Sequence, residues 1–109
     1  MDLIQFIEEL EQLVIIIDEI IENTDRNIEN GIEKMNSLIE GVKKIMPKWT
    51  YFIQETQIGK VEDLFTILDD INNGIEATDD VLLLDSLEYG LKSMVLEYIS
   101  IIKEALDDE

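Results

Sequence analysis

A chain of 109 residues that is 46% hydrophobic is long enough for one domain with its own core and too apolar for a disordered tail. Its 26 acidic and 8 basic residues give a net charge of −18, which argues against nucleic acid and anionic membranes as partners and favours either high solubility or a basic partner. Because cysteine and histidine are absent, the sequence excludes disulfides, a thiolate nucleophile, cysteine metal sites and a histidine general base.

The first predicted helix covers residues 2–22, because large apolar residues recur every three or four positions over nearly six turns. The run Leu13–Ile17 taken alone would also suit a strand, but the length of the pattern favours a helix. The same segment carries acidic residues near its start, whereas a signal peptide needs a basic start and an uncharged apolar run. No 18-residue run lacks a charge, so we expect no membrane span and a cytoplasmic location.

A polar patch, Asn23 to Asp25, predicts a turn and the N-cap of a second helix, although one helix continuous through the patch is the alternative. The second helix runs from Asp25 to Met46. Five basic and three acidic residues between Arg26 and Lys48 give it a local charge of +2, against −8 before it and −12 after it. We therefore expect this helix to pack between acidic helices. Gly31 lies in its apolar stripe and would allow a close helix crossing.

The only proline, Pro47, predicts a stop or a kink, because it lacks a backbone donor and disfavours helix at the residue before it. Trp49, Tyr51 and Phe52 follow it and predict one or two helical turns that end near Gly59. These aromatic residues form either a corner of the core or a binding patch, and the corner of the core is the favoured interpretation.

The third predicted helix runs from Lys60 to about Gly74, and the last helix runs from Thr78 to Leu106. Thr78, Asp79 and Asp80 suit a helix start, because they accept bonds from free backbone N–H groups. The apolar stripe of the last helix consists of Val81, Leu84, Leu87, Leu91, Met94, Val95, Tyr98, Ile99, Ile102 and Leu106. A helix this long and apolar needs partners over most of its length.

These four amphipathic segments, joined by short connections, predict an all-α fold. The expected architecture is a four-helix up-down antiparallel bundle with a break near Pro47, in which residues 1–109 form a single domain.

Two features of the sequence are candidates for a chemical site. The run from Asp69 to Gly74 has the spacing of a calcium loop, but Ile71 stands where the loop needs an oxygen ligand, so a helix end is favoured. Glu88 lies at the margin of the apolar stripe, and we expect it to pair with Lys92, four residues further on. We therefore expect no catalytic residue, no cofactor and no metal site.

The segment LLLDSLEYGL, residues 82–91, resembles the C-terminal helix of small, functionally uncharacterised acidic helical proteins of Gram-positive bacteria, whose pattern is LLxDxLEYEL. The matching residues are Leu83, Asp85, Leu87, Glu88, Tyr89 and Leu91. Gly90 replaces the usual glutamate, and Ser93 stands where those proteins often have a proline. The resemblance covers about a tenth of the chain. It implies a bacterial cytosolic protein and no particular activity.

Some apolar residues lie outside the apolar stripes, so they are more than a single core requires. In the first helix these are Ile4, Ile15 and Ile16, and in the last helix Leu82, Tyr89 and Leu96. Single exposed apolar residues are normal on protein surfaces. Two extra apolar faces nevertheless predict a surface on the first and last helices that binds a partner or a second copy of the chain.

Three classes of function fit these observations. The favoured one is a non-enzymatic adaptor, chaperone or regulator that binds a partner protein through an apolar helix face or groove. The alternative is an acidic inhibitor or immunity-type protein that mimics nucleic acid and blocks a basic partner. The third, a carboxylate-metal enzyme, is the least favoured of the three.

Overall fold

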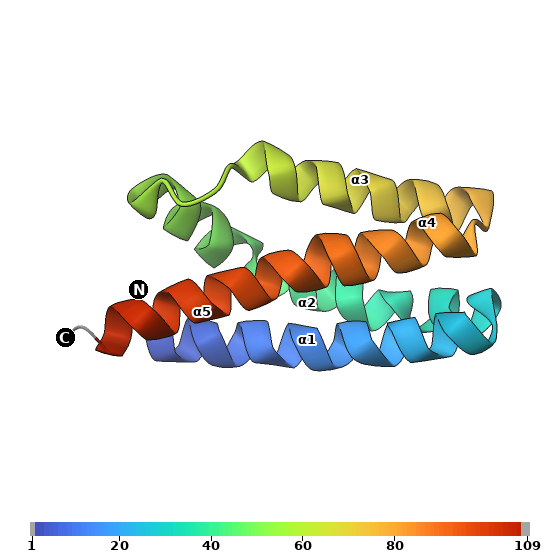
Figure 1. Cartoon of the computed structure of the whole chain (residues 1–109), viewed down its shortest axis with the longest axis horizontal. Helices are drawn as coiled ribbons and strands as arrows, with labels where there is room; N and C mark the ends of the chain where they lie inside the picture. The colour runs from blue at the N-terminus through green and yellow to red at the C-terminus, as the bar shows by residue number, and fades with distance from the viewer. Residues whose placement is uncertain (1, 108–109) are drawn as a thin grey trace.

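Residues 2–107, the part of the chain that the structure describes, form four helices in this computed structural model (Figure 1). The structure is 92% helical and shows no strand in these residues. The helices are α1 (Leu3–Arg26), α2 (Ile28–Thr56), α3 (Val61–Ala77) and a last helix in three parts, namely α4 (Asp80–Asp85), a π-helical segment η1 (Ser86–Lys92) and α5 (Ser93–Asp107). The predicted all-α four-helix bundle is therefore confirmed.

The last helix lies at the centre of the bundle. It packs against α1 along α4, η1 and α5, and it carries α3 on η1 and α4 (Figure 1). The basic helix α2 packs along acidic α1, but it meets α3 only slightly. The prediction that α2 lies between two acidic helices is thus correct for α1 and wrong for α3, because α3 packs on the last helix instead.

The boundary between α1 and α2 lies at Asn27, two residues beyond the predicted turn. Asn27 has an extended backbone, and its side-chain oxygen accepts a bond of 2.9 Å from the amide of Glu29. The residues of the predicted turn are helical instead, because Asn23 donates to the carbonyl of Glu19 (2.7 Å) and Thr24 is buried. Polarity suggested a turn here, but Thr24 faces inward.

The buried position of Thr24 explains why residue 31 is a glycine. A Cβ atom built on Gly31 would overlap the Thr24 hydroxyl and would lie 2.8 Å from the Thr24 Cβ. The two helices can therefore cross this closely only because Gly31 has no side chain. This agrees with the prediction of a close crossing.

The break predicted near Pro47 is a bend within one helix, since α2 continues through Pro47 to Thr56. Pro47 cannot donate to the carbonyl one turn back. The Thr50 hydroxyl bonds to the carbonyls of Met46 (3.0 Å) and Pro47 (3.1 Å) beside it. Beyond Pro47, the end of α2 turns upward toward α3 (Figure 1), and the burial of Trp49, Phe52 and Ile53 holds it against the core.

The π-helical segment determines which side of the last helix is buried. The buried row consists of Leu83, Leu87, Leu91, Val95 and Ile99, each four residues from the next. In an α-helix a step of four residues overshoots a full turn by about 40°, so this row would drift by about 160° around the helix. The wider turn of the π segment removes much of that drift. The row therefore stays on one face.

The same segment explains the error in the predicted stripe. The predicted stripe includes Val81, Leu84 and Leu87, and of these Leu87 is fully buried. Val81, however, is 64% exposed and Leu84 is half-buried, whereas Leu83 is fully buried. A π segment contains one extra residue in its turn, so the core-facing positions before it move by one residue.

Three ion pairs connect α1 to other helices. Glu9 pairs with Lys48 of α2 (2.6 Å), Asp18 with Lys92 of η1 (2.7 Å), and Glu11 with Lys103 of α5 (3.2 Å). All charged side chains of α1 before Arg26 are acidic. Lysines on two neighbouring helices therefore reach the negative surface of α1 from both sides.

We predict that Gly31→Ala lowers the free energy of unfolding by about 1–3 kcal/mol, the usual result of overpacking. The matched control is Gly41→Ala on the same helix, where the nearest atom to the new Cβ would be the tip of Leu13 at 2.9 Å. That tip can move, and alanine adds up to about 1 kcal/mol of helix propensity. Urea unfolding followed by circular dichroism compares the two. Equal stability of both variants would contradict the close crossing.

Deleting Tyr89 from the π segment should be tolerated better than deleting Glu97 from α5. The first deletion lets the wide turn become an ordinary α-helical turn, so its cost stays within about 0.5–3 kcal/mol. The second turns Tyr98, Ile99 and Ile102 away from the core, and each displaced large side chain costs on the order of 2–5 kcal/mol. Thermal melting of the two deletion variants measures the difference. A Tyr89 deletion as damaging as that of Glu97 would show that the segment does not set the register.

Candidate functional site

An open apolar groove with a volume of about 620 Å³ lies between α2 and α3. Its apolar walls are Met35, Leu38, Ile39, Val42, Met46 and Pro47 from α2, and Leu68 and Ile71 from α3. Ile39 is 41% exposed within it. This volume lies in the range of ordinary ligand sites, which are mostly apolar with a few polar groups.

The groove exists because α3 is held by the last helix. A Cβ atom on Gly74 would lie 3.1 Å from the backbone of Leu83, and one on Gly90 would lie 3.3 Å from Ile67. Because neither glycine has a side chain, α3 can lie close against α4 and η1. The apolar residues of α2 that α3 would cover in a regular bundle are therefore left facing the groove, and the bend at Pro47 lies at one end of it.

The polar rim of the groove consists of Lys43 and Thr50 from α2 and Asn72 from α3. Among residues 2–107, Lys43 forms no ion pair. No carboxylate lines the groove. Its chemistry is thus a broad apolar floor with one cationic group and two neutral hydrogen-bonding groups at the edge, which suits the binding of apolar side chains.

The six predicted partner-binding residues do not form one surface. Ile15 and Leu96 meet in a shallow cleft of about 280 Å³ between α1 and α5, together with Val14 and Ile99. Ile15 is 52% and Leu96 is 46% exposed. Ile16 is half-buried toward α2, since its Cδ1 lies 3.9 Å from the position of a Cβ on Gly41.

The other three predicted residues lie outside this cleft. Ile4 is exposed near the start of α1, Leu82 is half-buried in α4, and Tyr89 is 73% exposed in η1. The helical wheel placed Leu82 and Tyr89 in line with Leu96. The π segment between Leu82 and Leu96 changes the register, so that alignment does not hold.

Two further predictions about charged residues are corrected. Lys92 pairs with Asp18 of α1 and not with Glu88, which is exposed. In the π segment, residues four apart are not stacked as in an α-helix, and Lys92 is turned toward α1. The run from Asp69 to Gly74 lies inside α3, which ends only at Ala77, so it is neither a loop nor a helix end. Within residues 2–107, no group of three or more acidic side chains is placed to hold a metal ion.

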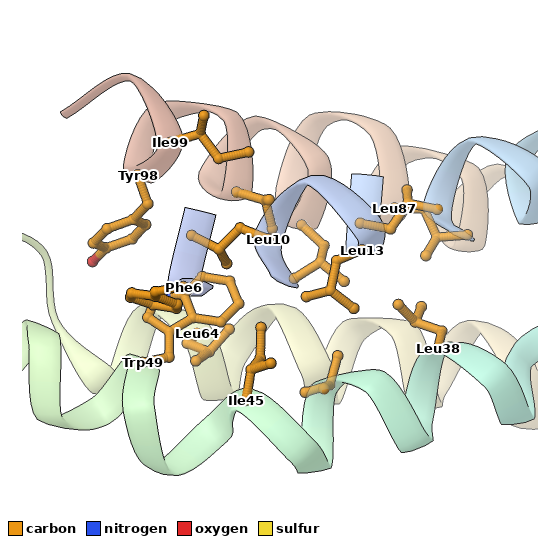
Figure 2. Packing of buried hydrophobic residues seen from close by; sticks show 14 of the residues in the cluster. Phe6, Leu10, Leu13, Leu38, Ile45, Trp49, Leu64, Leu87, Tyr98 and Ile99 are labelled. Atoms are coloured by element: carbon orange, nitrogen blue, oxygen red, sulfur yellow. The ribbon is translucent and has the colours of Figure 1, made fainter. Parts of the chain in front are cut away.

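Trp49 and Phe52, two of the aromatic residues after Pro47, form part of the core, which agrees with the favoured interpretation of a core corner. Trp49 and Phe52 pack edge-on against Tyr98, with ring centroids 5.6 and 5.8 Å away, and Phe6 packs against Phe52 at 5.7 Å. Figure 2 shows Phe6, Trp49 and Tyr98 within this part of the core. Tyr51 points outward and is exposed. The cluster ties the bent end of α2 to α1 and α5.

Tyr98 also holds the connection between α2 and α3. Its hydroxyl donates a bond of 2.7 Å to the carbonyl of Ile58, and Gly59 next to it has a φ of 81°. A side chain on Gly59 would collide with this hydroxyl. Burial raises the pKa of Tyr98 above its ordinary value of 10.0. The negative charges of Glu97 and Asp63 add to the rise, while the indole of Trp49 opposes it.

Comparisons of the chain with protein-family models, curated proteins and solved structures gave no match. None of the helices within residues 2–107 has the length and apolar character to cross a membrane.

The groove between α2 and α3 was missed in the sequence because its residues read as ordinary core. Met35, Ile39 and Met46 follow the helical period of the second helix, which places all three inward. Met35 is buried as this period predicts, whereas Ile39 is 41% exposed and Met46 is half-buried. The one available signal was Pro47, which disturbs the helix at the end of this stripe. Periodicity shows that a face is apolar, but it does not show whether another helix covers it.

We predict that Tyr98→Phe lowers the free energy of unfolding by about 1 kcal/mol, through loss of the bond to Ile58. Because the folded pKa is raised, the stability that Tyr98 contributes is fully present below pH 10 and is lost as the pH rises from 10 through the folded pKa. Urea unfolding between pH 9 and pH 11 should show this loss in the wild type and in the control Tyr51→Phe, but less of it in Tyr98→Phe. Identical pH profiles for all three proteins would contradict the assignment.

Proposed function

We propose that the protein is a non-enzymatic interaction module that binds an apolar helical segment of a basic partner protein in the groove between α2 and α3. The observation that carries the proposal is the open apolar groove itself. The floor of the groove is formed by buried side chains such as Met35 and Leu38, and the packing of α3 on the last helix leaves Ile39, Met46 and Leu68 accessible above them.

The dimensions of the groove support a helical occupant. Its lining residues on α2 extend from Met35 to Thr50, and fifteen helical steps correspond to about 22 Å. This length matches about four turns of an amphipathic helix, which would place apolar residues at positions i, i+3 or i+4, and i+7 in the groove. The half-buried Met46 suits such a surface, because its flexible side chain adapts to different partners.

The charge of the chain supports a basic partner. A net charge of −18 attracts basic proteins at long range and repels acidic ones. Glu62 and Asp69 of α3 are exposed but do not line the groove. The lysine or arginine on the polar side of the bound helix would therefore be attracted by the net charge of the chain as a whole.

The alternative, an acidic inhibitor that mimics nucleic acid, is supported by the net charge alone. A charge mimic needs no apolar groove, whereas a helix-binding module does, so the groove favours the interaction module. The polar groups on the rim, Lys43, Thr50 and Asn72, likewise support binding more than catalysis. The resemblance of residues 82–91 to Gram-positive proteins supports a bacterial cytoplasmic setting for this function.

The test uses a fluorescent synthetic helix of leucine and lysine, with leucines at i, i+3, i+4 and i+7, and anisotropy as the readout. We predict that Ile39→Glu weakens binding of this peptide at least about tenfold, because it removes one apolar contact of about 1.5–3 kcal/mol and places a charge in the groove. The matched control is Ile4→Glu, which changes another exposed isoleucine far along the chain and adds the same charge. It should bind like the wild type.

A second peptide separates the two proposals. It keeps every lysine but replaces each leucine with glutamine. If this peptide binds as tightly as the leucine peptide, and high salt abolishes both interactions, only charge is recognised and the nucleic-acid mimic is the better account. Retained binding of the leucine peptide at high salt, lost in Ile39→Glu, supports the groove.

A further inference from the structure

A second apolar surface lies on the opposite pair of helices, α1 and α5. Ile15 and Leu96 are both about half exposed and line the shallow cleft between these helices. The ion pair Glu11–Lys103 lies on one side of them along the seam, and the pair Asp18–Lys92 lies on the other. The seam is thus a short apolar strip between two neutralised charge pairs, on a chain that is otherwise strongly acidic.

The two halves of this surface carry opposite charge. On the last helix, the positions three, four and seven residues from Leu96, apart from the buried Ile99, are Tyr89 and Lys92 of η1 and Ser93, Ser100 and Lys103 of α5, with no carboxylate. On α1, the corresponding positions around Ile15 include Glu8, Glu11, Asp18, Glu19 and Glu22. Residues at these spacings share a helix face. Lys92 and Lys103 pair within the chain with Asp18 and Glu11, so the α1 half stays acidic through Glu8, Glu19 and Glu22, while the half on the last helix carries two lysines and no carboxylate at these positions.

We infer that this surface binds a second copy of the chain in a two-fold symmetric dimer. A two-fold axis parallel to the helices would place α1 of each copy against α5 of the other. Ile15 would then face Leu96 of the second copy, and the acidic half of each surface would lie on the basic half of the other. An axis perpendicular to the helices would instead place α1 on α1, with acid against acid. Charge therefore selects the first arrangement.

This geometry also keeps the groove between α2 and α3 free, because the groove is lined by neither α1 nor α5. The dimer would therefore present two helix-binding grooves. It stands independently of the proposed function, since its evidence lies on different helices.

The net charge of each copy opposes the association. Two chains of −18 repel one another, and salt screens this long-range repulsion more than it weakens close pairs. Raising the ionic strength from low to physiological should therefore tighten the dimer. In sedimentation equilibrium at physiological salt, we expect the wild type to reach twice its monomer mass of 12.6 kDa.

Substitutions test the surface. Ile15→Glu and Leu96→Glu should each shift the protein to monomer without lowering its melting temperature appreciably, because both side chains are half exposed. Ile39→Glu in the groove adds the same charge and should leave the dimer intact. A wild type that stays monomeric at millimolar concentration and high salt would overturn the inference.

Cross-linking tests the orientation. The native chain has no cysteine, so a disulfide can form only where cysteines are introduced. A mixture of the single variants Ile15→Cys and Leu96→Cys, treated with oxidised glutathione, should give a covalent dimer containing one chain of each kind. Ile15→Cys alone should give much less. A covalent dimer formed by Ile15→Cys alone and not by the mixture would place α1 on α1 and overturn the proposed axis.

Discussion

A row of buried apolar side chains, spaced four residues apart from Leu83 to Ile99, holds the bundle together. Every other helix depends on the last one, directly or through α1, because this row meets α1 on one side and α3 on the other. An uninterrupted α-helix would spread such a row around its circumference. The π segment Ser86–Lys92 keeps the row on one face. The packing of the whole bundle therefore depends on this local irregularity of the backbone.

The groove follows from the same constraint. Once Gly74 and Gly90 let α3 approach the last helix closely, α3 meets α2 only slightly and leaves Ile39 and Met46 of its apolar face uncovered. The bend at Pro47 and the aromatic cluster around Tyr98 then carry the end of α2 across to reach α3. The open face of α2 is therefore a consequence of where α3 finds its tightest packing, and the proposed binding function rests on that consequence.

Ion pairs between α1 and its neighbouring helices support this architecture. The acidic surface of α1 receives lysines from α2 and from the last helix, which offsets part of the repulsion within a chain of −18. The pairs at Asp18 and Glu11 also neutralise the seam between α1 and α5, where the proposed dimer would form. The remaining carboxylates stay on the surface, where they raise solubility and attract basic partners.

The sequence by itself determined the helical class, the number of helices, and most of the core. Periodic apolar spacing reports which residues share a helix face, and that was enough to place Phe6, Leu10, Val42 and Ile102 inward. It also indicated the close crossing at Gly31 and the aromatic corner after Pro47. Three features were decided only by tertiary structure. Thr24 is buried although it is polar, the register shifts by one residue before Leu87, and α3 packs mainly on the last helix and only slightly on α2. The burial of Thr24 and the place of α3 depend on how helices pack on one another, and the register depends on a π turn that the apolar spacing does not reveal. The period of a single helix carries no information about which partner covers it.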